Sequence, residues 1–430
     1  YQGKNLEGSQ DFVDDDYSRF VNQIVKGFQK NVLDFSGMHI TLNVLTRVPK
    51  LLRLKPSISK IDLYDNMLMD SGLQSLHQIL LSNPQIVSID IGCNDLSDGS
   101  MICLMDIIKN TNVVKIQLGY KQFTWQANHF SVGGLSQILS VIANSNRTCC
   151  LGLNGAMTRA AKTNSSPTPF SVYLSKLIKE ATNLSTLNAS NLFLNDSDQP
   201  MLHDGFSENH SLRHLNLSGN HFSQGIQFIE GIAQIRTLVY LNLSSCSLST
   251  PSCIVIANAF SKGWHLISLD LSNNRIGSQG ISKLFSTLSQ NSTLTTLNLS
   301  LNNFDSTIEP SLRKFLMSNK VLASLDISKN HLSDSIAYAF ADSLSSNDSL
   351  MNLNLSSCWI TDDGIIKMAN SIIQNNTLKK LIFKDNFLST KIGFVLLEIL
   401  QANTSLLHID LSSNQIDSFA IDAINSLCKR

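Results

Sequence analysis

The sequence lacks several features that would indicate a catalytic, membrane or nucleic-acid-binding protein. Its 33 Lys and Arg residues balance its 33 Asp and Glu residues, so no global basic field favours nucleic acid. No apolar run reaches the roughly 18 residues of a membrane span, and no secretory leader is visible. The chain has no Gly-rich phosphate loop, nucleophile elbow or HExxH zinc helix. We therefore expect no enzymatic activity, no cofactor, no metal, no nucleic-acid partner and no membrane span.

The cysteines lack a pairing pattern. The eight cysteines form no CxxC pair, and Cys103, Cys246, Cys358 and Cys428 fall on or beside apolar columns of the sequence. Such thiols pack as small apolar groups in a reducing compartment. Many Asn-x-Ser/Thr sequons argue the other way, but most of them arise from the repeat itself, as Asn216-Leu217-Ser218 and Asn298-Leu299-Ser300 do within predicted strands. We therefore expect free thiols and a cytoplasmic location, either free or associated with the cytoskeleton.

What the sequence does contain is a repeat. From Leu266 onward a leucine recurs every 28 residues and begins the same short phrase, as in LISLDLSNNRI, LTTLNLSLNNF and LASLDISKNHL. The six clear copies begin at Leu266, Leu294, Leu322, Leu350, Leu378 and Leu406. A period of this length indicates one supersecondary unit copied in tandem, in which each copy buries its apolar face against its neighbours.

Each copy is predicted to form a strand, a turn, a helix and a second turn. Counting Leu266 as position one, apolar residues return at positions four, six and eleven, and Asn274 occupies position nine. The period-two spacing predicts a short strand. Leu284 and Leu288, at positions 19 and 23, share one face of a predicted helix. Asn291 at position 26 is expected to close that helix in the left-handed conformation.

The Asn at position nine lies among core residues and therefore needs hydrogen-bond partners. We expect its amide to bridge backbone groups of adjacent copies, with a cost of about 1–3 kcal/mol if one buried partner is lost. Cys246 and Cys358 replace it in two copies. Lys121, Ala156 and Leu192 occupy the position in three others, so the column is broken in the middle of the chain.

This layout resembles the leucine-rich repeat family, specifically its ribonuclease-inhibitor-like class, in which LxxLxLxxNxL is followed by a full helix. The resemblance implies an α/β solenoid, or horseshoe, with a parallel sheet on the concave side and helices on the convex side. Weaker copies extend the pattern backwards and bring the total to 14. They begin at Leu238, Leu212, Leu184, Thr148, Val113, Ile86, Ile58 and Lys30.

Residues 1–29 precede the first copy and are predicted to form a capping helix region, while residues 30–430 form the solenoid. Three aspartates, Asp14 to Asp16, come directly before an amphipathic helical pattern, and acids suit the start of a helix. The alternative is that this segment is the last helix of a preceding domain. Because the chain begins at Tyr1 without Met, we expect a fragment of a longer protein.

Two adjacent copies are longer than the others. Those beginning at Val113 and Thr148 run to 35 and 36 residues, and the excess comes after the strand and before the helix. Insertions at the same point of neighbouring repeats emerge on the same rim and often mark a binding face. The residues predicted to contact a partner there are Phe123, Trp125, Phe130, Arg159, Lys162 and Phe170. The alternative is a loop that packs only on its neighbour.

A second set of candidates lies on the exposed face of the predicted strands. Most exposed strand positions carry small polar residues, so larger side chains there are plausible binding residues. The candidates are Tyr64, Lys115 and Tyr120 near the N-terminus, beside Lys60 and Asp65, and Lys380, Ile382 and Lys384 near the C-terminus.

Two other constellations are not expected to carry chemistry. Asp or Asn recurs at position five, as at Asp62 and Asp90, but the repeat sets this spacing, which favours a solvated ladder over a catalytic pair. A group of histidines also falls on different faces of the predicted units, so we expect no common metal site. These are His203, His210, His214 and His221.

The sequence therefore predicts a non-enzymatic protein-binding scaffold, with protein partners on the concave face and the rim loops. We expect it to be part of a larger assembly, such as a cytoskeletal or axonemal complex. One alternative is a GTPase-activating regulator similar to the Ran activators. However, no FTGR-like stretch is present, Arg159 lacks that context, and the chain ends in basic residues. Another alternative is the ligand-sensing repeat domain of a cytosolic receptor of the innate-immune type.

Overall fold

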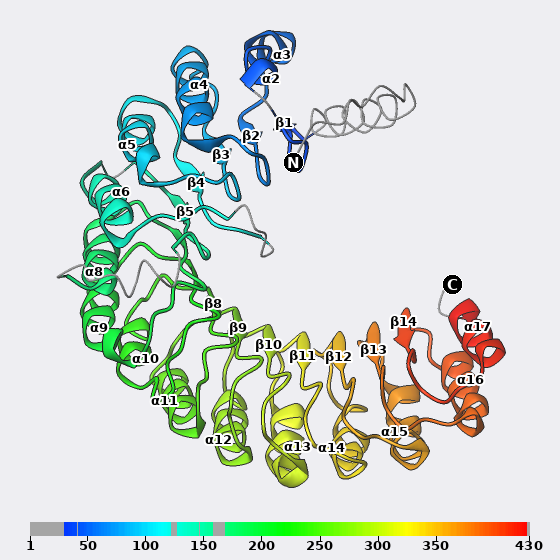
Figure 1. Cartoon of the computed structure of the whole chain (residues 1–430). Coiled ribbons are helices and arrows are strands. Elements are labelled where there is room, and N and C mark those ends of the chain that lie inside the picture. Colours follow the sequence, from blue (N-terminus) through cyan, green and yellow to red (C-terminus); the bar gives the residue numbers. More distant parts are fainter. Residues whose placement is uncertain (1–29, 41, 122–126, 146, 158–167, 428–430) are drawn as a thin grey trace, which may run out of the picture. The chain divides into compact units, whose positions relative to one another are not determined.

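The computed structural model describes residues 30–40, 42–121, 127–145, 147–157 and 168–427. The chain divides into two compact units, Tyr1–Leu192 and Phe193–Arg430. The predicted capping region, residues 1–29, lies outside the described residues. In both units, helices cover one face of a parallel sheet and leave the other face open (Figure 1).

The described residues form a sheet of fourteen parallel strands of three residues each, ordered as in the chain. The first unit contains β1 (Val32–Asp34), β2 (Lys60–Asp62), β3 (Ser88–Asp90), β4 (Lys115–Gln117), β5 (Cys150–Gly152) and β6 (Thr186–Asn188). The second contains β7 (His214–Asn216), β8 (Tyr240–Asn242), β9 (Ser268–Asp270), β10 (Thr296–Asn298), β11 (Ser324–Asp326), β12 (Asn352–Asn354), β13 (Lys380–Ile382) and β14 (His408–Asp410). These are the fourteen copies that the sequence predicted.

The apolar columns set the register between strands. The central residue of every strand is the apolar residue at position four, and it pairs with its equivalent in the next strand, as Leu297 does with Leu269 and Leu325. Leu297 is 1% exposed, and Leu299 at position six is fully buried. Because side chains alternate along a strand, a slip of one residue would expose this column, so the leucines fix the pairing.

Helices follow the strands and pack side by side against the covered face. Those of the first unit are α2 (Leu42–Leu45), α3 (Val48–Leu54), α4 (Met69–Ser82), α5 (Met101–Asn110), α6 (Val132–Ser145) and α8 (Phe170–Glu180). Those of the second are α9 (Gln199–Ser207), α10 (Gln227–Ile232), α11 (Thr250–Ser261), α12 (Ser278–Leu288), α13 (Glu309–Ser318), α14 (Ser335–Ser343), α15 (Asp362–Gln374), α16 (Gly393–Ala402) and α17 (Ser418–Leu427). The paired positions 19 and 23 of α12, Leu284 and Leu288, are buried as predicted.

The Asn at position nine links neighbouring copies, as predicted. The Asn274 side chain donates to the carbonyls of Leu243 and Leu271, both at 2.9 Å. Its Oδ1 accepts the backbone N–H groups of Cys246 and Leu248 at 3.0 and 2.9 Å. Cys246, which replaces the Asn in the preceding copy, is fully buried, and its thiol donates to Leu217 O at 3.2 Å. The thiol thus retains one of the bonds that the amide makes.

The prediction for position 26 was wrong. Asn375 ends α15 with φ −77° and ψ 130°, which is extended backbone and not the left-handed conformation. Its Nδ2 donates to Leu344 O and Asn347 O of the preceding copy at 2.7 and 2.9 Å. Its Oδ1 accepts the N–H groups of Thr377 and Leu378. Position 26 is therefore a second asparagine column, which joins the copies on their helical side.

The first of the two long copies restores the asparagine column with a later residue. Lys121 stands at position nine by count, yet Asn128 makes the bonds of that position. Asn128 Nδ2 donates to Ile91 O and Leu118 O, and its Oδ1 accepts the N–H groups of Asn94 and Leu96. The seven-residue excess of this copy therefore lies between Tyr120 and Asn128, and the column is not broken there.

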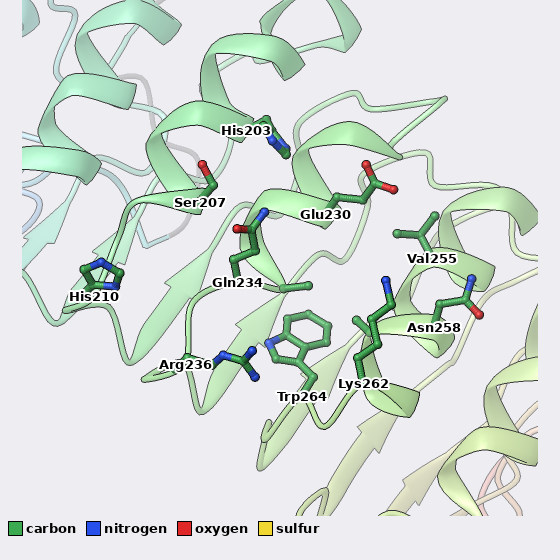
Figure 2. Close-up of a pocket in the computed structure, with 12 residues that line it drawn as sticks. His203, Ser207, His210, Glu230, Gln234, Arg236, Val255, Asn258, Lys262 and Trp264 are labelled. Atoms are coloured by element: carbon green, nitrogen blue, oxygen red, sulfur yellow. The ribbon is translucent and has the colours of Figure 1, made fainter.

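The shortest α-helix of the second unit borders a cavity on the helical side. The copy that begins at Leu212 is two residues shorter than 28, and its helix α10 has only six residues. A cavity of about 660 Å³ lies among α9, α10 and α11 (Figure 2).

Candidate functional site

The Asp and Asn side chains at position five hold the turn that follows each strand. Asp270 accepts the N–H of Ser272 at 2.9 Å, and Asn298 accepts the N–H of Ser300 at 3.0 Å. The same contact recurs at Asp34, Asp62, Asp90, Asn188, Asn216, Asn242, Asp326, Asn354 and Asp410. Only the oxygen that Asp and Asn share is needed, so the two alternate. The column expected to be a solvated ladder is therefore a series of Asx turns.

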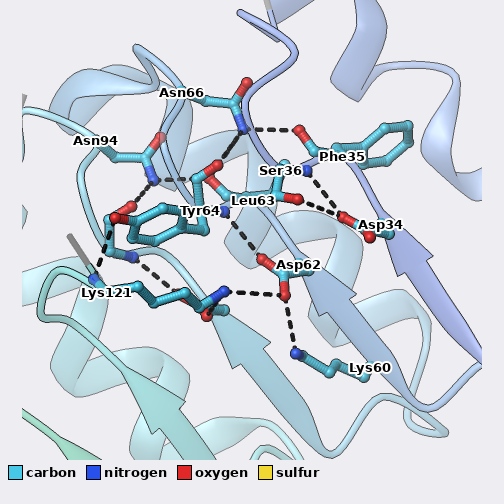
Figure 3. Close-up of polar contacts among 12 residues, drawn as sticks. Asp34, Phe35, Ser36, Lys60, Asp62, Leu63, Tyr64, Asn66, Asn94 and Lys121 are labelled. Carbon is cyan, nitrogen blue, oxygen red and sulfur yellow. Dashed lines mark hydrogen bonds and ion pairs between the residues drawn. The ribbon is translucent and has the colours of Figure 1, made fainter. Parts of the chain in front are cut away.

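Two of these aspartates are buried beneath a lysine in the first unit (Figure 3). Asp62 and Asp90 stand opposite each other on β2 and β3 and are 7% and 2% exposed. Lys121 Nζ lies 2.8 Å from Asp90 Oδ2 and 3.5 Å from Asp62 Oδ2. Lys60 Nζ contacts Asp62 Oδ2 at 2.8 Å. The two buried carboxylates thus share one ammonium group, and Asp62 has a second.

Tyr64 fixes the position of this lysine. The Tyr64 hydroxyl accepts the backbone N–H of Lys121 at 3.1 Å, and Lys121 Nζ lies 4.4 Å from the centre of the Tyr64 ring. A cation at that distance from an aromatic face is attracted by its quadrupole. Tyr64 is therefore a half-buried part of the network.

The network shifts the pKa values of its members. Burial, followed by the charge of Asp62, raises the pKa of Asp90, and Lys121 offsets this only in part. Burial alone would lower the pKa of Lys121, but its hydrogen bonds and charge interactions with Asp90 and Asp62 raise it overall. The ammonium group therefore stays charged at neutral pH and holds together two carboxylates that would otherwise repel each other.

The other strand candidates of the first unit differ in exposure. Lys115 is exposed on β4. Tyr120 is half-buried, and a Cβ on Gly155 would lie 1.9 Å from Tyr120 Cε1, so only glycine, here at φ +57°, fits beneath the ring. Burial raises the pKa of the Tyr120 hydroxyl. Tyr120 thus packs closely on the next copy, while Lys115 extends into solvent.

The insertion candidates fall into two groups. Phe130 and Phe170 are 0% and 3% exposed, so both belong to the core and were wrongly predicted to contact a partner. Their burial has a local cause: Phe130 forms a parallel bridge with Met157 before α6 begins, and Phe170 is the first residue of α8. The other four, Phe123, Trp125, Arg159 and Lys162, lie outside the described residues.

In the second unit, Lys380 and Lys384 are exposed and Ile382 is half-buried between them. Ile382 occupies position five of its copy, where Asn354 and Asp410 on the flanking strands hold Asx turns. An apolar side chain thus replaces the polar turn residue on the open face of β13.

A row of exposed rings lies beside this strand and was not predicted from the sequence. Trp359 is 52% exposed and Phe387 is 58% exposed. The ring centres of His331 and Trp359 lie 4.7 Å apart. These three residues occupy position ten of consecutive copies and are termed the aromatic rim row below. Alignment of the last six copies at position ten, which in the other three carries Arg275, Asn303 and Gln415, is the signal that would have found them.

A groove follows the strand ends next to the aromatic rim row. It is lined mostly by small polar side chains, together with Lys329, Lys384 and Asp385. Ser357 Oγ donates to Asp385 Oδ2 at 2.8 Å across two copies. Three of its lining residues, Lys329, Ser357 and Asp385, are each two residues before a member of the row. We name this feature the strand-end groove and treat it with the row as one surface.

The cysteines and histidines of the described residues show no shared chemistry. The seven cysteines described are free, and burial raises the pKa of Cys246, Cys253 and Cys358 to about 12. Among the described residues no group of three or more His, Cys, Asp or Glu side chains is placed to hold a metal ion. His203 lies on α9 and His214 on β7, which are different faces of the unit.

Six stretches of the chain match a family model described as Leucine Rich repeat: residues 208–224, 265–285, 290–308, 318–341, 346–369 and 402–418. Human NACHT, LRR and PYD domains-containing protein 13 (Homo sapiens) is 37% identical over 86 residues, which are 19% of this chain and 8% of that protein. CD180 antigen of Mus musculus is 37% identical over 102 residues, which are 24% of this chain and 14% of that protein. The chain therefore spans only a small part of these relatives.

Solved structures were also compared with the chain. The actin-binding site 2 of leiomodin-1 is 25% identical with a TM-score of 0.25, covering 28% of this chain and 73% of that one. An internalin from Listeria monocytogenes is 16% identical with a TM-score of 0.47, covering 83% of this chain and 92% of that one.

None of the helices among the described residues is both long and apolar enough to cross a membrane. The matched stretches coincide with strand–helix copies, since residues 265–285 contain β9 and the beginning of α12. Repeats of this kind indicate a scaffold for protein–protein interaction, and the chain is a leucine-rich repeat protein.

Proposed function

We propose that this protein is a non-enzymatic scaffold that binds a protein partner through the aromatic rim row and the strand-end groove of its second unit. The observation that carries the proposal is the exposure of Trp359 and Phe387 on neighbouring copies, with His331 beside them. Trp is among the residue types that most often dominate the binding energy of an interface, and large aromatic rings add most of the buried apolar area.

The surroundings of the row support this proposal. Small hydroxyl and amide side chains of the strand-end groove offer hydrogen-bond donors and acceptors around the rings, and Lys329 and Lys384 add charge. Lys380 and Ile382 extend the same surface onto β13. An apolar centre within a polar rim is the usual anatomy of a protein interface.

Affinity capture with rim variants tests this site. Trp359→Ala and Phe387→Ala should each weaken partner binding by roughly 2 kcal/mol, or about thirtyfold, if they are hot spots. Phe394→Ala is the matched control, because Phe394 is 83% exposed on α16, on the helical side. If partners and affinities are the same in all three variants, the aromatic rim row does not bind the partner.

The first unit offers a second surface, with Tyr64, Tyr120 and Lys115 on its open face. Phe123, Trp125, Arg159 and Lys162 of the two insertions remain predicted contacts for the same partner. Replacing both insertions with turns of standard length should leave the fold intact, because each copy contacts only its neighbours. If the shortened protein captures the same partners with unchanged affinity, the insertions are not part of the interface.

The proposal extends to a cytoplasmic protein of the ribonuclease-inhibitor-like class within a larger, cytoskeletal or axonemal assembly. The α-helix present in most copies supports the class, and the free thiols of the seven described cysteines, four of which are buried, support a reducing compartment. Capture from the source cell tests the assembly: cytoskeletal or axonemal subunits are the expected partners. Capture of a small GTPase whose GTP hydrolysis the protein stimulates would instead favour a GTPase-activating regulator similar to the Ran activators. Capture of nucleotide-binding receptor domains would favour a ligand-sensing repeat domain of an innate-immune-type receptor.

A further inference from the structure

The cavity among α9, α10 and α11 contains a buried hydrogen-bond donor without an acceptor. Trp264 is 4% exposed, and its Nε1 has no hydrogen-bond partner among the described residues. The ring itself is held in place by Phe260, with ring centres 5.5 Å apart. Native proteins seldom leave a buried N–H unpaired, so such a group calls for an explanation.

Trp264 also departs from the pattern of the repeat. It occupies position 27 of its copy, and the next five copies carry a polar residue at that position, namely Ser292, Lys320, Asp348, Asn376 and Thr404. The preceding residue, Gly263, replaces the Asn of position 26 and has φ +86°. A turn that is polar elsewhere is thus rebuilt here so that an indole ring lines the cavity.

The charged groups that line the cavity are mostly basic. Arg236, Lys262, His203 and His210 line it, with Glu230 as the one acidic side chain among the lining residues. Neither Arg236 nor Lys262 forms an ion pair in the part of the chain that the structure describes. Figure 2 shows the indole nitrogen on the side of the ring that faces Arg236. An indole N–H and a guanidinium group thus converge without an acceptor between them.

We propose that this cavity is a binding site for a small ligand that carries a carboxylate or phosphoryl group. The oxyanion would accept the Trp264 Nε1–H and the fork of Arg236, while Lys262 adds a charge. The walls formed by Trp264, Val255 and Ala233 suit an apolar part of the ligand, and the volume lies within the range of small-molecule sites. This site lies on the helical side and is independent of the aromatic rim row.

The indole N–H signal of Trp264 in a nitrogen-15 correlation spectrum provides a direct readout, assigned through Trp264→Phe. The probes are inorganic phosphate, N-acetylglutamate and the neutral N-acetylglutamine, each titrated at constant ionic strength. We expect a saturable downfield shift with phosphate or N-acetylglutamate and none with N-acetylglutamine. A response to phosphate alone identifies a phosphoryl ligand, and a response to N-acetylglutamate alone identifies a carboxylate ligand.

Three variants complete the test on the full chain. Arg236→Gln should weaken the binding of the responding probe at least tenfold. Trp264→Phe, which keeps a ring but removes the donor, should weaken it about fivefold in calorimetry, with circular dichroism confirming the fold. Lys283→Gln is the matched control, since Lys283 is exposed on α12 and does not line the cavity. The proposal is overturned if no probe gives a saturable shift, if the neutral probe binds equally well, or if Arg236→Gln behaves like Lys283→Gln.

Discussion

Replacing Lys121 with methionine should unbalance the buried carboxylates of the first unit. The substitution keeps most of the aliphatic stem but removes the ammonium group, which lies 2.8 Å from Asp90 Oδ2 and 3.5 Å from Asp62 Oδ2. Removing one partner of a fully buried ion pair costs about 3–5 kcal/mol. The Lys121 side chain is 54% exposed and Lys60 still pairs with Asp62, so solvent screening reduces the expected loss to about 1–3 kcal/mol at pH 7.

The loss should depend on pH in a defined direction. The pKa of Asp90 is already raised in the folded state by burial and by Asp62, and Lys121→Met removes the opposing effect of the lysine. When the pKa of an acid is higher in the folded than in the unfolded state, the folded state is favoured most below the unfolded pKa of about 4. That contribution to the free energy of unfolding is lost as the pH rises through the folded pKa. The destabilisation by Lys121→Met should therefore be large at pH 7 and should shrink as the pH falls towards 4.

Urea unfolding of the full chain, followed by circular dichroism at pH 7.5, 6 and 4.5, measures this difference. Hydrogen exchange of the β2 and β3 amides locates the effect in the first unit. Lys115→Met serves as the control, because Lys115 is exposed on the same face and forms no ion pair among the described residues. It should change the free energy of unfolding by less than about 0.5 kcal/mol. Equal effects of the two substitutions at pH 7.5, or an effect of Lys121→Met that does not depend on pH, would refute the reasoning.

Three further predictions concern the repeat itself. Leu297→Ala should lower the free energy of unfolding in urea by about 2–5 kcal/mol because it leaves a cavity in the core. Asn298→Ala should lower it by only about 1 kcal/mol, for the lost turn bond to Ser300. Equal losses would contradict the assignment of Leu297 to the buried face of the strand. Asn128→Ala should cost about 1–3 kcal/mol because it orphans buried groups of neighbouring copies, and a loss no larger than that of an exposed Asn would contradict its role. All eight thiols should be free, and Cys246 should be alkylated only after denaturation because its side chain is fully buried, which also raises its pKa to about 12; mass spectrometry would reveal any stoichiometric disulfide.

The strand register was predictable because burial alone sets it. Leu269, Leu297 and Leu325 are core residues in consecutive strands, and a periodic column of large apolar side chains has one way to be buried. The position-nine Asn was predictable for a related reason, since a polar group in a core column needs backbone partners.

The candidate site was harder to predict because it depends on which side chains meet across copies. The role of Lys121 requires that seven extra residues precede Asn128, so that a position assigned to the core by count instead reaches Asp62 and Asp90. Phe130 resembles an exposed loop aromatic in sequence, yet it is fully buried next to Met157. The spacing of residues in the sequence does not reveal the contact of Lys121 with the aspartates or that of Phe130 with Met157.

Asn128 shows that a copy of this fold can gain residues without a change in which of its later positions are buried. Tyr120 ends one turn and Asn128 resumes the hydrogen bonds of position nine, while β4 and β5 still pair residue for residue, with Ile116 opposite Leu151. Extra sequence added at this junction does not shift any later residue between core and surface. The junction is therefore a natural graft point. Peptides of different length could be inserted there and displayed from a single copy, while the contacts between the other copies stay unchanged.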